Sequence, residues 1–148
     1  MDETGIDTFV YREYAYAKRG DKVPQLVSGK KYKRVGIVAA LMNKKIISPL
    51  QYDGAMDSTL FELWFEQCLI PELPPNSVIV MDNASFHRKS RLIPFAQSSG
   101  HNMIFLPPYS PDFNKIEHVW SWLKNKLKKV ITEFECFDDA LCYCFRWI

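Results

Sequence analysis

The sequence lacks any long apolar run, and this absence limits how the chain could associate with a membrane. Its longest uninterrupted apolar stretch, from about Val35 to Met42, is far shorter than the roughly 20 residues that a bilayer-spanning helix needs. The opening "MDETGID" is acidic and polar, unlike the apolar centre of a secretory signal peptide. We therefore expect a cytoplasmic protein with no membrane partner.

Cysteine is scarce and irregularly placed. The four cysteines form no CxxC pair and have no matching histidine spacing; they are Cys68, Cys136, Cys142 and Cys144. Zinc sites and disulfide frameworks depend on such regular spacing. We expect buried, reduced thiols rather than zinc ligands or disulfides.

The chain has no internal repeat and no low-complexity linker, so nothing in it marks a domain boundary. Its 148 residues, 47% of them hydrophobic, are enough for one domain with a real core. We expect residues 1–148 to form a single domain.

Basic residues are missing from the middle of the chain, and the charge is uneven. Residues 50–82 include six acids and no Lys or Arg, whereas residues 12–34 include eight basic residues and residues 115–129 five lysines. Basic segments set apart from an acidic one indicate a face that meets a polyanion, although charge runs are more often simply solvated. The charge pattern alone favours nucleic acid only slightly.

Four segments have the composition of β-strands. They are residues 34–42, 45–52, 77–82 and 102–106. The first two are separated by Asn43-Lys44, which predicts an antiparallel hairpin. The last two are short continuous apolar runs, which indicate strands buried on both faces.

Apolar residues at helical spacing predict four helices. The first begins at a cap at Asp57, Ser58 or Thr59 and is ended by Pro71 and the Pro74-Pro75 pair. The others run from about residue 88 to 99, from 115 to about 130, and through a last amphipathic stretch from Phe134 to Phe145. The order is therefore hairpin, helix, strand, helix, strand, helix, helix. This order indicates an α/β fold.

Three acidic residues are candidates for chemistry, and each has a simpler alternative. Asp82 ends a predicted strand, where ligands gather in mixed sheets, but Asp82-Asn83 also suits a turn. Glu117 opens a predicted helix, but it stands three residues after Asn114, the spacing of a capping box. Asp2 is equally consistent with a polar residue near a frayed terminus.

A proline-rich loop precedes Glu117. Proline fixes its own φ and restricts the residue before it, so Pro107, Pro108 and Pro111 predict a stiff connection. Tyr109 and Ser110 are expected to shape the same loop, which would hold Glu117 in a fixed position.

Several motifs together carry a family resemblance. They are "DETGI" at Asp2, "GKKYKRVGIVAAL" at Gly29, "SVIVMDNASFH" at Ser77 and "FLPPYSPDFNKIEHVWSWLK" at Phe105, and 34 residues separate Asp82 from Glu117. Over nearly its whole length the sequence resembles the mariner-type transposases, in particular their bacterial insertion-sequence branch with its DDE catalytic domain. The resemblance implies a ribonuclease-H-like mixed sheet flanked by helices. It also implies a catalytic, metal-binding triad of Asp2, Asp82 and Glu117.

The resemblance further implies a two-metal mechanism. Two Mg²⁺ ions, with Mn²⁺ as a possible substitute, would lie about 3.5–4 Å apart, with Asp82 bridging them and Asp2 and Glu117 completing one site each. Water would first cleave at the transposon ends, and the freed 3′ hydroxyl would then attack target DNA. The implied partners are double-stranded DNA, both transposon ends and target, and a second copy in a homodimer, with nucleoid association when DNA is bound.

The sequence departs from the family pattern in three places. Lys115 replaces a usual proline, which loosens the first helical turn, and Lys18 lies in "AYAKRG" where the family has Ala-Pro-Arg-Gly. In the family a helix-turn-helix region precedes the DDE domain, and in this sequence only Met1 precedes Asp2. We therefore expect a truncated first strand in a catalytic half, from a frameshifted gene or a remnant.

Other residues fit this interpretation with less specificity. Lys124 and Lys128 lie on the same helical side as Glu117, where they would either contact phosphate or form a solvated face. His87 would either approach the metal site or serve as a hydrogen-bonded structural histidine. A core stripe that includes Trp120 is expected on this helix: Ile116, Val119, Trp120, Leu123, Leu127, Val130 and Ile131.

Two other functions remain open. One is an inactive remnant that acts at most as a non-specific DNA-binding module. The other is a nuclease that cleaves without strand transfer. Retained acids at all three positions favour catalysis, and only joined DNA products would separate a transposase from a nuclease.

Overall fold

The computed structural model describes residues 1–8, 34–108 and 110–148. Most of the basic segment 12–34, with Lys18, and the loop residue Tyr109 lie outside the described residues. Among the helices in the described part of the chain, none is long and apolar enough to cross a membrane.

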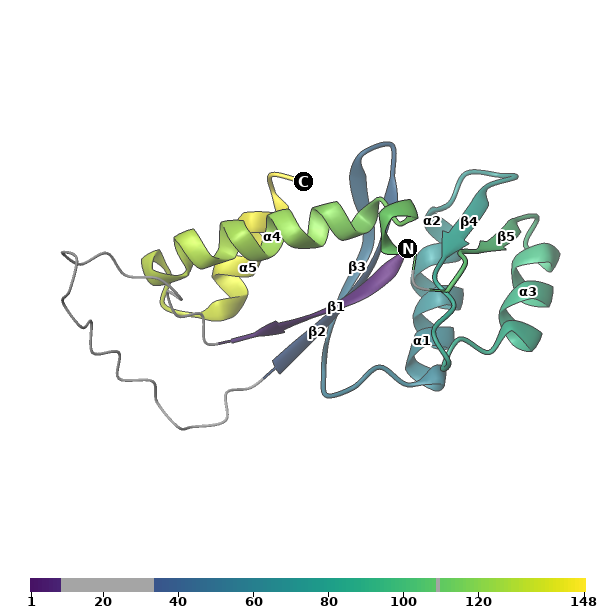
Figure 1. The fold of residues 1–148 in the computed structure, drawn as a ribbon, viewed down its shortest axis with the longest axis horizontal. Coiled ribbons are helices and arrows are strands. Elements are labelled where there is room, and N and C mark those ends of the chain that lie inside the picture. Colours follow the sequence, from purple (N-terminus) through teal and green to yellow (C-terminus); the bar gives the residue numbers. More distant parts are fainter. Residues whose placement is uncertain (9–33, 109) are drawn as a thin grey trace.

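A three-stranded antiparallel sheet forms the centre of the fold (Figure 1). Its strands, in spatial order, are β1 (Asp2–Asp7), β2 (Arg34–Met42) and β3 (Lys45–Asp53). All six residues of β1 pair with β2, beginning with Asp2 opposite Ala39. The turn residues Asn43 and Lys44 have φ of 51° and 66°, the left-handed conformation that a two-residue hairpin turn requires. The predicted hairpin is confirmed.

A separate two-stranded parallel sheet contains β4 (Val78–Met81) and β5 (Asn102–Phe105). Its crossover is α3 (Lys89–Ser98), which ends before Gly100 at φ 82°, a position where glycine avoids a steric penalty. These three elements agree with the sequence prediction to within a residue or two at each end.

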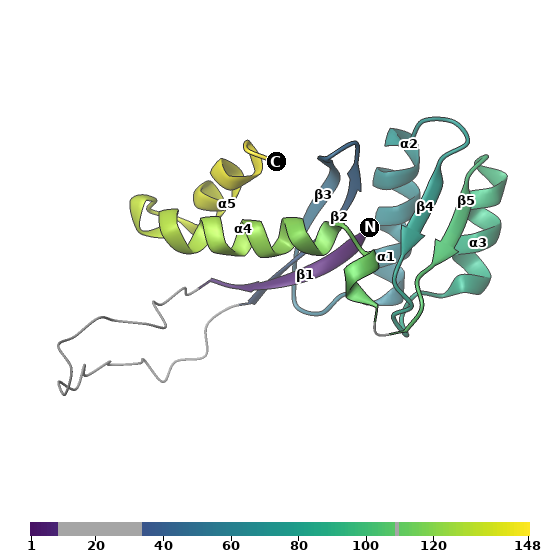
Figure 2. The same ribbon diagram turned by 45° about the horizontal axis from the view of Figure 1, so that its top comes forward.

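The prediction that both of these strands are buried on two faces is wrong. One face packs Ile79 and Met81 into the core, but the opposite face leaves Val78 53% and Ile104 52% exposed. Helices α4 and α5 pack against the three-stranded sheet instead, as Figure 2 shows. A continuous apolar run in the sequence therefore did not show whether other elements cover one face of a strand or both.

The first helical segment continues through Pro71 and ends before the Pro74-Pro75 pair, which agrees with the predicted end at these prolines. It runs as α1 (Ser58–Trp64), a π-helical turn (Phe65–Leu69) and α2 (Ile70–Glu72). Asp57 caps it by accepting a hydrogen bond from Leu60 N. Pro71 lies in the first turn of α2, where its missing N–H costs little. The change of hydrogen-bond pattern in the π-helical turn thus lets the helical path continue past a proline.

The C-terminal part forms α4 (Ile116–Val130) and α5 (Phe137–Phe145) on one face of the three-stranded sheet (Figures 1 and 2). The predicted stripe on α4 is confirmed. Its buried members are Ile116, Trp120, Leu123, Leu127 and Val130, with Val119 and Ile131 partly buried against them. Trp120 is a packing residue with 1% of its surface exposed.

The central strand β2 serves two hydrophobic cores because its side chains alternate between faces. Ile37 and Ala39 pack with α4 and α5, whereas Val38 and Ala40 pack with α1, β4 and α3. The end of β4 therefore lies on one face of β2, and the start of α4 lies on the other face.

The two sheets meet at the amino end of β1. Among the described residues β1 and β4 do not pair as strands, but the amine of Met1 donates a hydrogen bond to Val80 O at 2.8 Å. Cavities of about 210 Å³ and 490 Å³ lie beside this junction, and Met1, Leu41 and Val80 line both. The expected truncation of the first strand stays a prediction.

The cysteines differ from expectation in their burial. All four are free thiols, but only Cys144 is buried, and Cys68, Cys136 and Cys142 are exposed. Cys136 instead caps α5, where its sulfur accepts from Asp139 N at 3.4 Å. Their occurrence on helix surfaces and at a helix cap accounts for the wrong prediction of burial.

Candidate active site

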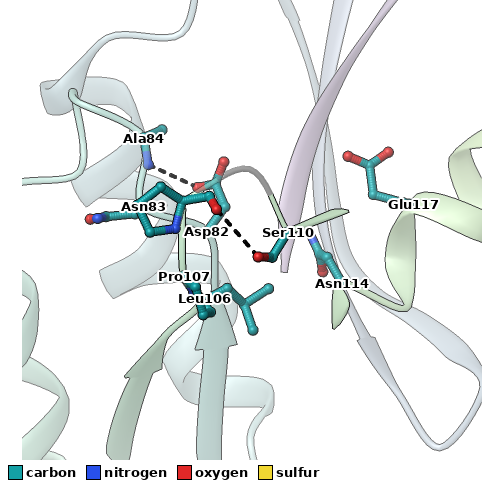
Figure 3. Close-up of a pocket in the computed structure, with 9 residues that line it drawn as sticks. Asp82, Asn83, Ala84, Leu106, Pro107, Ser110, Asn114 and Glu117 are labelled. Atoms are coloured by element: carbon teal, nitrogen blue, oxygen red, sulfur yellow. Dashed lines mark hydrogen bonds between the residues drawn. The ribbon is translucent and has the colours of Figure 1, made fainter. Parts of the chain in front are cut away.

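Asp82 and Glu117 line the same open cavity of about 390 Å³. Figure 3 shows Asp82 on one side, after the end of β4, and Glu117 on the other, at the start of α4. The remaining lining residues are Asn83, Ala84, Leu106, Pro107, Pro108, Ser110 and Asn114. The proline-rich loop thus forms part of the wall between the two carboxylates.

Asp82 is placed by the strand before it. Met81, fully buried, fixes the end of β4, and Met81 O accepts from Leu106 N at 2.8 Å. Asp82 Oδ1 then accepts from Ala84 N at 3.1 Å. The turn suggested as an alternative is therefore present, and it coexists with a carboxylate that remains 44% exposed.

Glu117 lies in the first turn of α4 and is exposed. Two buried residues just before it, Asn114 and Ile116, anchor this end of the helix. No side-chain hydrogen bond caps α4, and its N-cap position is Lys115 rather than Asn114. The capping-box alternative is therefore not the arrangement in the structure.

Asp2 lies deeper, at the start of β1, with 7% of its surface exposed. Its Oδ1 accepts from Glu3 N at 2.8 Å, while its Oδ2 is buried without a hydrogen-bond partner among the described residues. Burial, followed by the charges of Glu117 and Glu3, raises the pKa of Asp2 to about 7. Asp2 does not line the cavity, but it is near enough to Glu117 and Asp82 to feel their charges.

His87 contacts two carboxylates from inside the core. Its Nδ1 lies 3.2 Å from Asp82 Oδ1, and its Nε2 lies 3.3 Å from Glu3 Oε1. The first contact lacks the alignment of a good hydrogen bond and is mainly electrostatic. Burial alone would lower the pKa of His87, but the two carboxylates raise it to about 9. The same contact is the largest cause of the lowered pKa of Asp82.

The acids of the site differ in their protonation state near neutral pH. Near neutral pH Asp82 is ionised because its pKa is lowered, whereas Asp2, with a pKa of about 7, is half protonated. Burial, with repulsion from neighbouring carboxylates, raises the pKa of Asp2, whereas the contact with His87 lowers the pKa of Asp82. A cation that relieved the repulsion would also release the proton from Asp2.

The donor set suits a hard divalent cation. Mg²⁺ prefers carboxylate oxygens, and Asp2 Oδ2 is an unpartnered buried acceptor of that kind. Within the described ranges, however, no three such side chains are close enough to form a ready metal cluster. The residues therefore fit a cation in their chemistry, and binding would require them to close on it.

Glu3 is the site residue that sequence reasoning missed. Adjacent strand residues point to opposite faces, so the pair Asp2-Glu3 could have indicated carboxylates on both faces of β1. Its partner His87 lies 84 residues away, and no local pattern connects the two.

The two candidate DNA-binding lysines lie on α4. Lys124 is half-buried and Lys128 is exposed. At a rise of about 1.5 Å per residue, they lie roughly 10 Å and 16 Å along the helix from Glu117. The structure thus places both on the helix that also presents Glu117.

Comparison with known proteins shows the family to which the chain belongs. The sequence matches the family described as DDE superfamily endonuclease over residues 1–140. The chain belongs to this family, and its membership confirms the resemblance drawn from the motifs. A curated relative, the uncharacterized protein y4pE/y4sA of Sinorhizobium fredii (strain NBRC 101917 / NGR234), is 31% identical over 75 residues. That alignment covers 47% of this chain and 48% of the relative.

A solved transposase structure shows the same fold. The Mos1 transposase paired-end complex with left transposon end has a TM-score of 0.57 at 13% identity, covering 98% of this chain and 51% of that one. The catalytic core domain of BIV integrase has a TM-score of 0.48 at 18% identity, covering 74% and 78%. The ribonuclease-H-like fold expected from the sequence is confirmed, and the chain spans about half the length of the transposase.

Proposed function

We propose that this chain is the catalytic domain of a DNA transposase that cleaves at transposon ends and joins them to target DNA. The observation that carries the proposal is the placement of Asp82 and Glu117 on one cavity. The buried Asp2 beside them has a carboxylate oxygen without a partner among the described residues. Family membership supports the same chemistry.

Asp2, Asp82 and Glu117 would hold two Mg²⁺ ions, or Mn²⁺ in their place. When bound, such ions stabilise the attacking and leaving oxygens of a phosphoryl displacement. Asp82 and Glu117 would supply oxygen ligands from opposite sides of the cavity, and the buried Asp2 would supply a third. Pro107 and Pro108 keep the wall of the cavity stiff, which limits how far the acids must move to close on a cation.

DNA would lie along the helix that presents Glu117. Lys124 and Lys128 add positive charge along α4, which suits contacts to successive phosphates. We propose that two copies act together on paired ends, and that a separate part of a longer polypeptide recognises the end sequence. Chromosomal DNA is the substrate, so the protein would work in the cytoplasm on the nucleoid.

Substitution of the two facing acids tests the proposal. Asp82→Asn and Glu117→Gln keep side-chain shape but remove charge. Each should reduce Mg²⁺-dependent cleavage of a duplex carrying the ends of the chain's own element by roughly 100-fold or more, because catalytic groups act as a unit. Asp112→Asn is the matched control, since Asp112 is an exposed acid in the turn before α4.

The products distinguish the remaining alternatives. Joined DNA products support a transposase, whereas cleavage without joining indicates a nuclease. DNA binding with no cleavage in either Mg²⁺ or Mn²⁺ indicates the non-specific binding module. Cleavage by Asp82→Asn at the wild-type rate contradicts the assignment of the acids.

A further inference from the structure

His87 is held more tightly than a surface-loop histidine needs to be. Its ring packs against both Phe61 and Phe86, with centroids 4.3 Å from each, and its side chain is 1% exposed. The backbone beside it is also fixed, because Ser58 Oγ donates to Phe86 O at 2.7 Å. The ring therefore has a defined orientation.

The next residue secures the same loop to α1. Arg88 Nε lies 2.7 Å from Glu62 Oε1, and Arg91 contacts the other oxygen of Glu62 at 3.3 Å. Glu62 is buried, with a side chain 8% exposed, whereas Arg88 and Arg91 are 42% and 63% exposed, so only the carboxylate side of this ion pair is shielded from solvent. The segment after β4 is thus fixed on both sides of His87.

The two ring nitrogens of His87 reach acids on different strands. Nδ1 lies 3.2 Å from Asp82 Oδ1, after β4, and Nε2 lies 3.3 Å from Glu3 Oε1, on β1. Asp82 Oδ1 also accepts from Ala84 N. Both contacts occupy the same oxygen of Asp82, which leaves Oδ2 as the oxygen available to a ligand.

This contact matters because the two strands that carry the acids do not pair. In the described part of the chain β1 and β4 belong to separate sheets. The hydrogen bond from the Met1 amine to Val80 O connects the two strands. The contacts of His87 with Asp82 and Glu3 connect them a second time. The distance between Asp2 and Asp82 therefore depends on the second link.

We propose that His87 is a positioning residue that fixes the carboxylate of Asp82 relative to β1, so that Asp82 and Asp2 can share a divalent cation. This inference rests on the proposed function, because it concerns the same metal-binding acids. His87 itself touches neither the cation nor DNA in this role.

Conservative variants separate positioning from simple packing. An Asn amide nitrogen can stand near the place of Nδ1 and keep the contact with Asp82, whereas a Gln amide nitrogen stands nearer to Nε2 and loses it. We expect His87→Gln to weaken Mn²⁺ binding to the 148-residue chain about 10-fold, the usual effect of losing a partner of a metal ligand. His87→Asn keeps the contact with Asp82 but loses the contact with Glu3 on β1. It also breaks the link between the two strands, so it should weaken Mn²⁺ binding by a similar factor of about 10.

Calorimetric titration with Mn²⁺ in the absence of DNA gives the affinity, and thermal unfolding of the same samples gives the stability. His101→Gln is the matched control, since His101 is another buried histidine, 5% exposed, at the start of β5. It should leave the Mn²⁺ affinity unchanged even if it lowers stability.

The outcomes separate this inference from the proposed function. If His87→Gln, His87→Asn and the wild type bind Mn²⁺ with equal affinity while Asp82→Asn abolishes binding, the positioning role is overturned and the proposed function is not. A wild-type chain that binds no Mn²⁺ overturns both. An affinity loss that follows the loss of stability in all variants, His101→Gln included, assigns His87 a packing role and overturns the inference.

Discussion

Asp2 is the residue whose surroundings conflict most with its charge. It is buried beside Glu117 and Glu3, and its pKa is raised to about 7, compared with about 3.9 for an unperturbed aspartate. Between these two values the folded chain holds a proton that the unfolded chain has lost. Stability from this residue is therefore greatest at low pH and decreases as the pH rises from about 4 to about 7.

Replacing Asp2 by Asn should remove the loss of stability that the charged Asp2 carboxylate causes as the pH rises. At pH 7.5 and without metal, Asp2→Asn is expected to be more stable than the wild type by on the order of 4 kcal/mol, and the difference should shrink at pH 5. Urea unfolding at the two pH values measures both effects. A difference that is equal at pH 5 and pH 7.5 would contradict a raised pKa.

Sequence reasoning found the acids at this site but not their arrangement. The end of a strand and the start of a helix indicated Asp82 and Glu117, because these positions have local signatures. The link between His87 and Glu3 depends on two segments 84 residues apart. Such a contact is set by tertiary packing, so the sequence offered only two open roles for His87.

At the scale of elements, α4 combines a structural stripe with the presentation of Glu117. Trp120 and Trp122 lie on the same helix, but Trp120 is 1% exposed and Trp122 is 40% exposed. The indole nitrogen of Trp120 is buried without a hydrogen-bond partner among the described residues. Its contribution to stability must therefore come from packing.

The pair of tryptophans gives a matched test of this packing. Trp120→Ala should lower the free energy of unfolding by about 3–5 kcal/mol because it opens a large cavity. Trp122→Ala should lower it by less than about 1 kcal/mol. Urea unfolding followed by circular dichroism provides both values, and similar losses would show that the helix is not anchored through the Trp120 face.

The elements themselves were largely predictable, and the failures have local causes. Gly100, the Asn43-Lys44 turn and the apolar stripe of α4 are strong signals that act within a few residues. The continuation of the helical path through Pro71 depends on a π-helical turn, which periodicity does not reveal. The exposed faces of β4 and β5 depend on where distant helices pack.

At the scale of the whole molecule, the main feature is a sheet in two parts. The edges of β2 beyond Ala40 and of β4 face each other across the two cavities that Met1, Leu41 and Val80 line. The register places Met1 opposite Ala40, so a residue ahead of Met1 would stand opposite Leu41. This is the space that the expected longer first strand would fill.

Extending the chain tests that expectation. Four alternately placed β-branched residues, Ile-Val-Ile-Val, added ahead of Met1 should pair with both edges and raise the unfolding midpoint by a few degrees, about 3 °C per kcal/mol gained. A Gly-Ser-Gly-Ser extension of equal length is the control and should give no increase. Equal midpoints for the two extensions in thermal unfolding would show that the space does not accept a strand.

The division of the cores between the two faces of β2 has a consequence for inactivation by heat. Asp82 follows the two-stranded sheet, whose outer face is bare, while Glu117 and Asp2 belong to elements packed on the three-stranded sheet. Proteins open first in their least covered cooperative units. Opening of the two-stranded part would separate the acids while most of the backbone remained ordered. The protein would then lose the proposed catalytic activity at temperatures where the amide hydrogens along β2 are still protected from exchange.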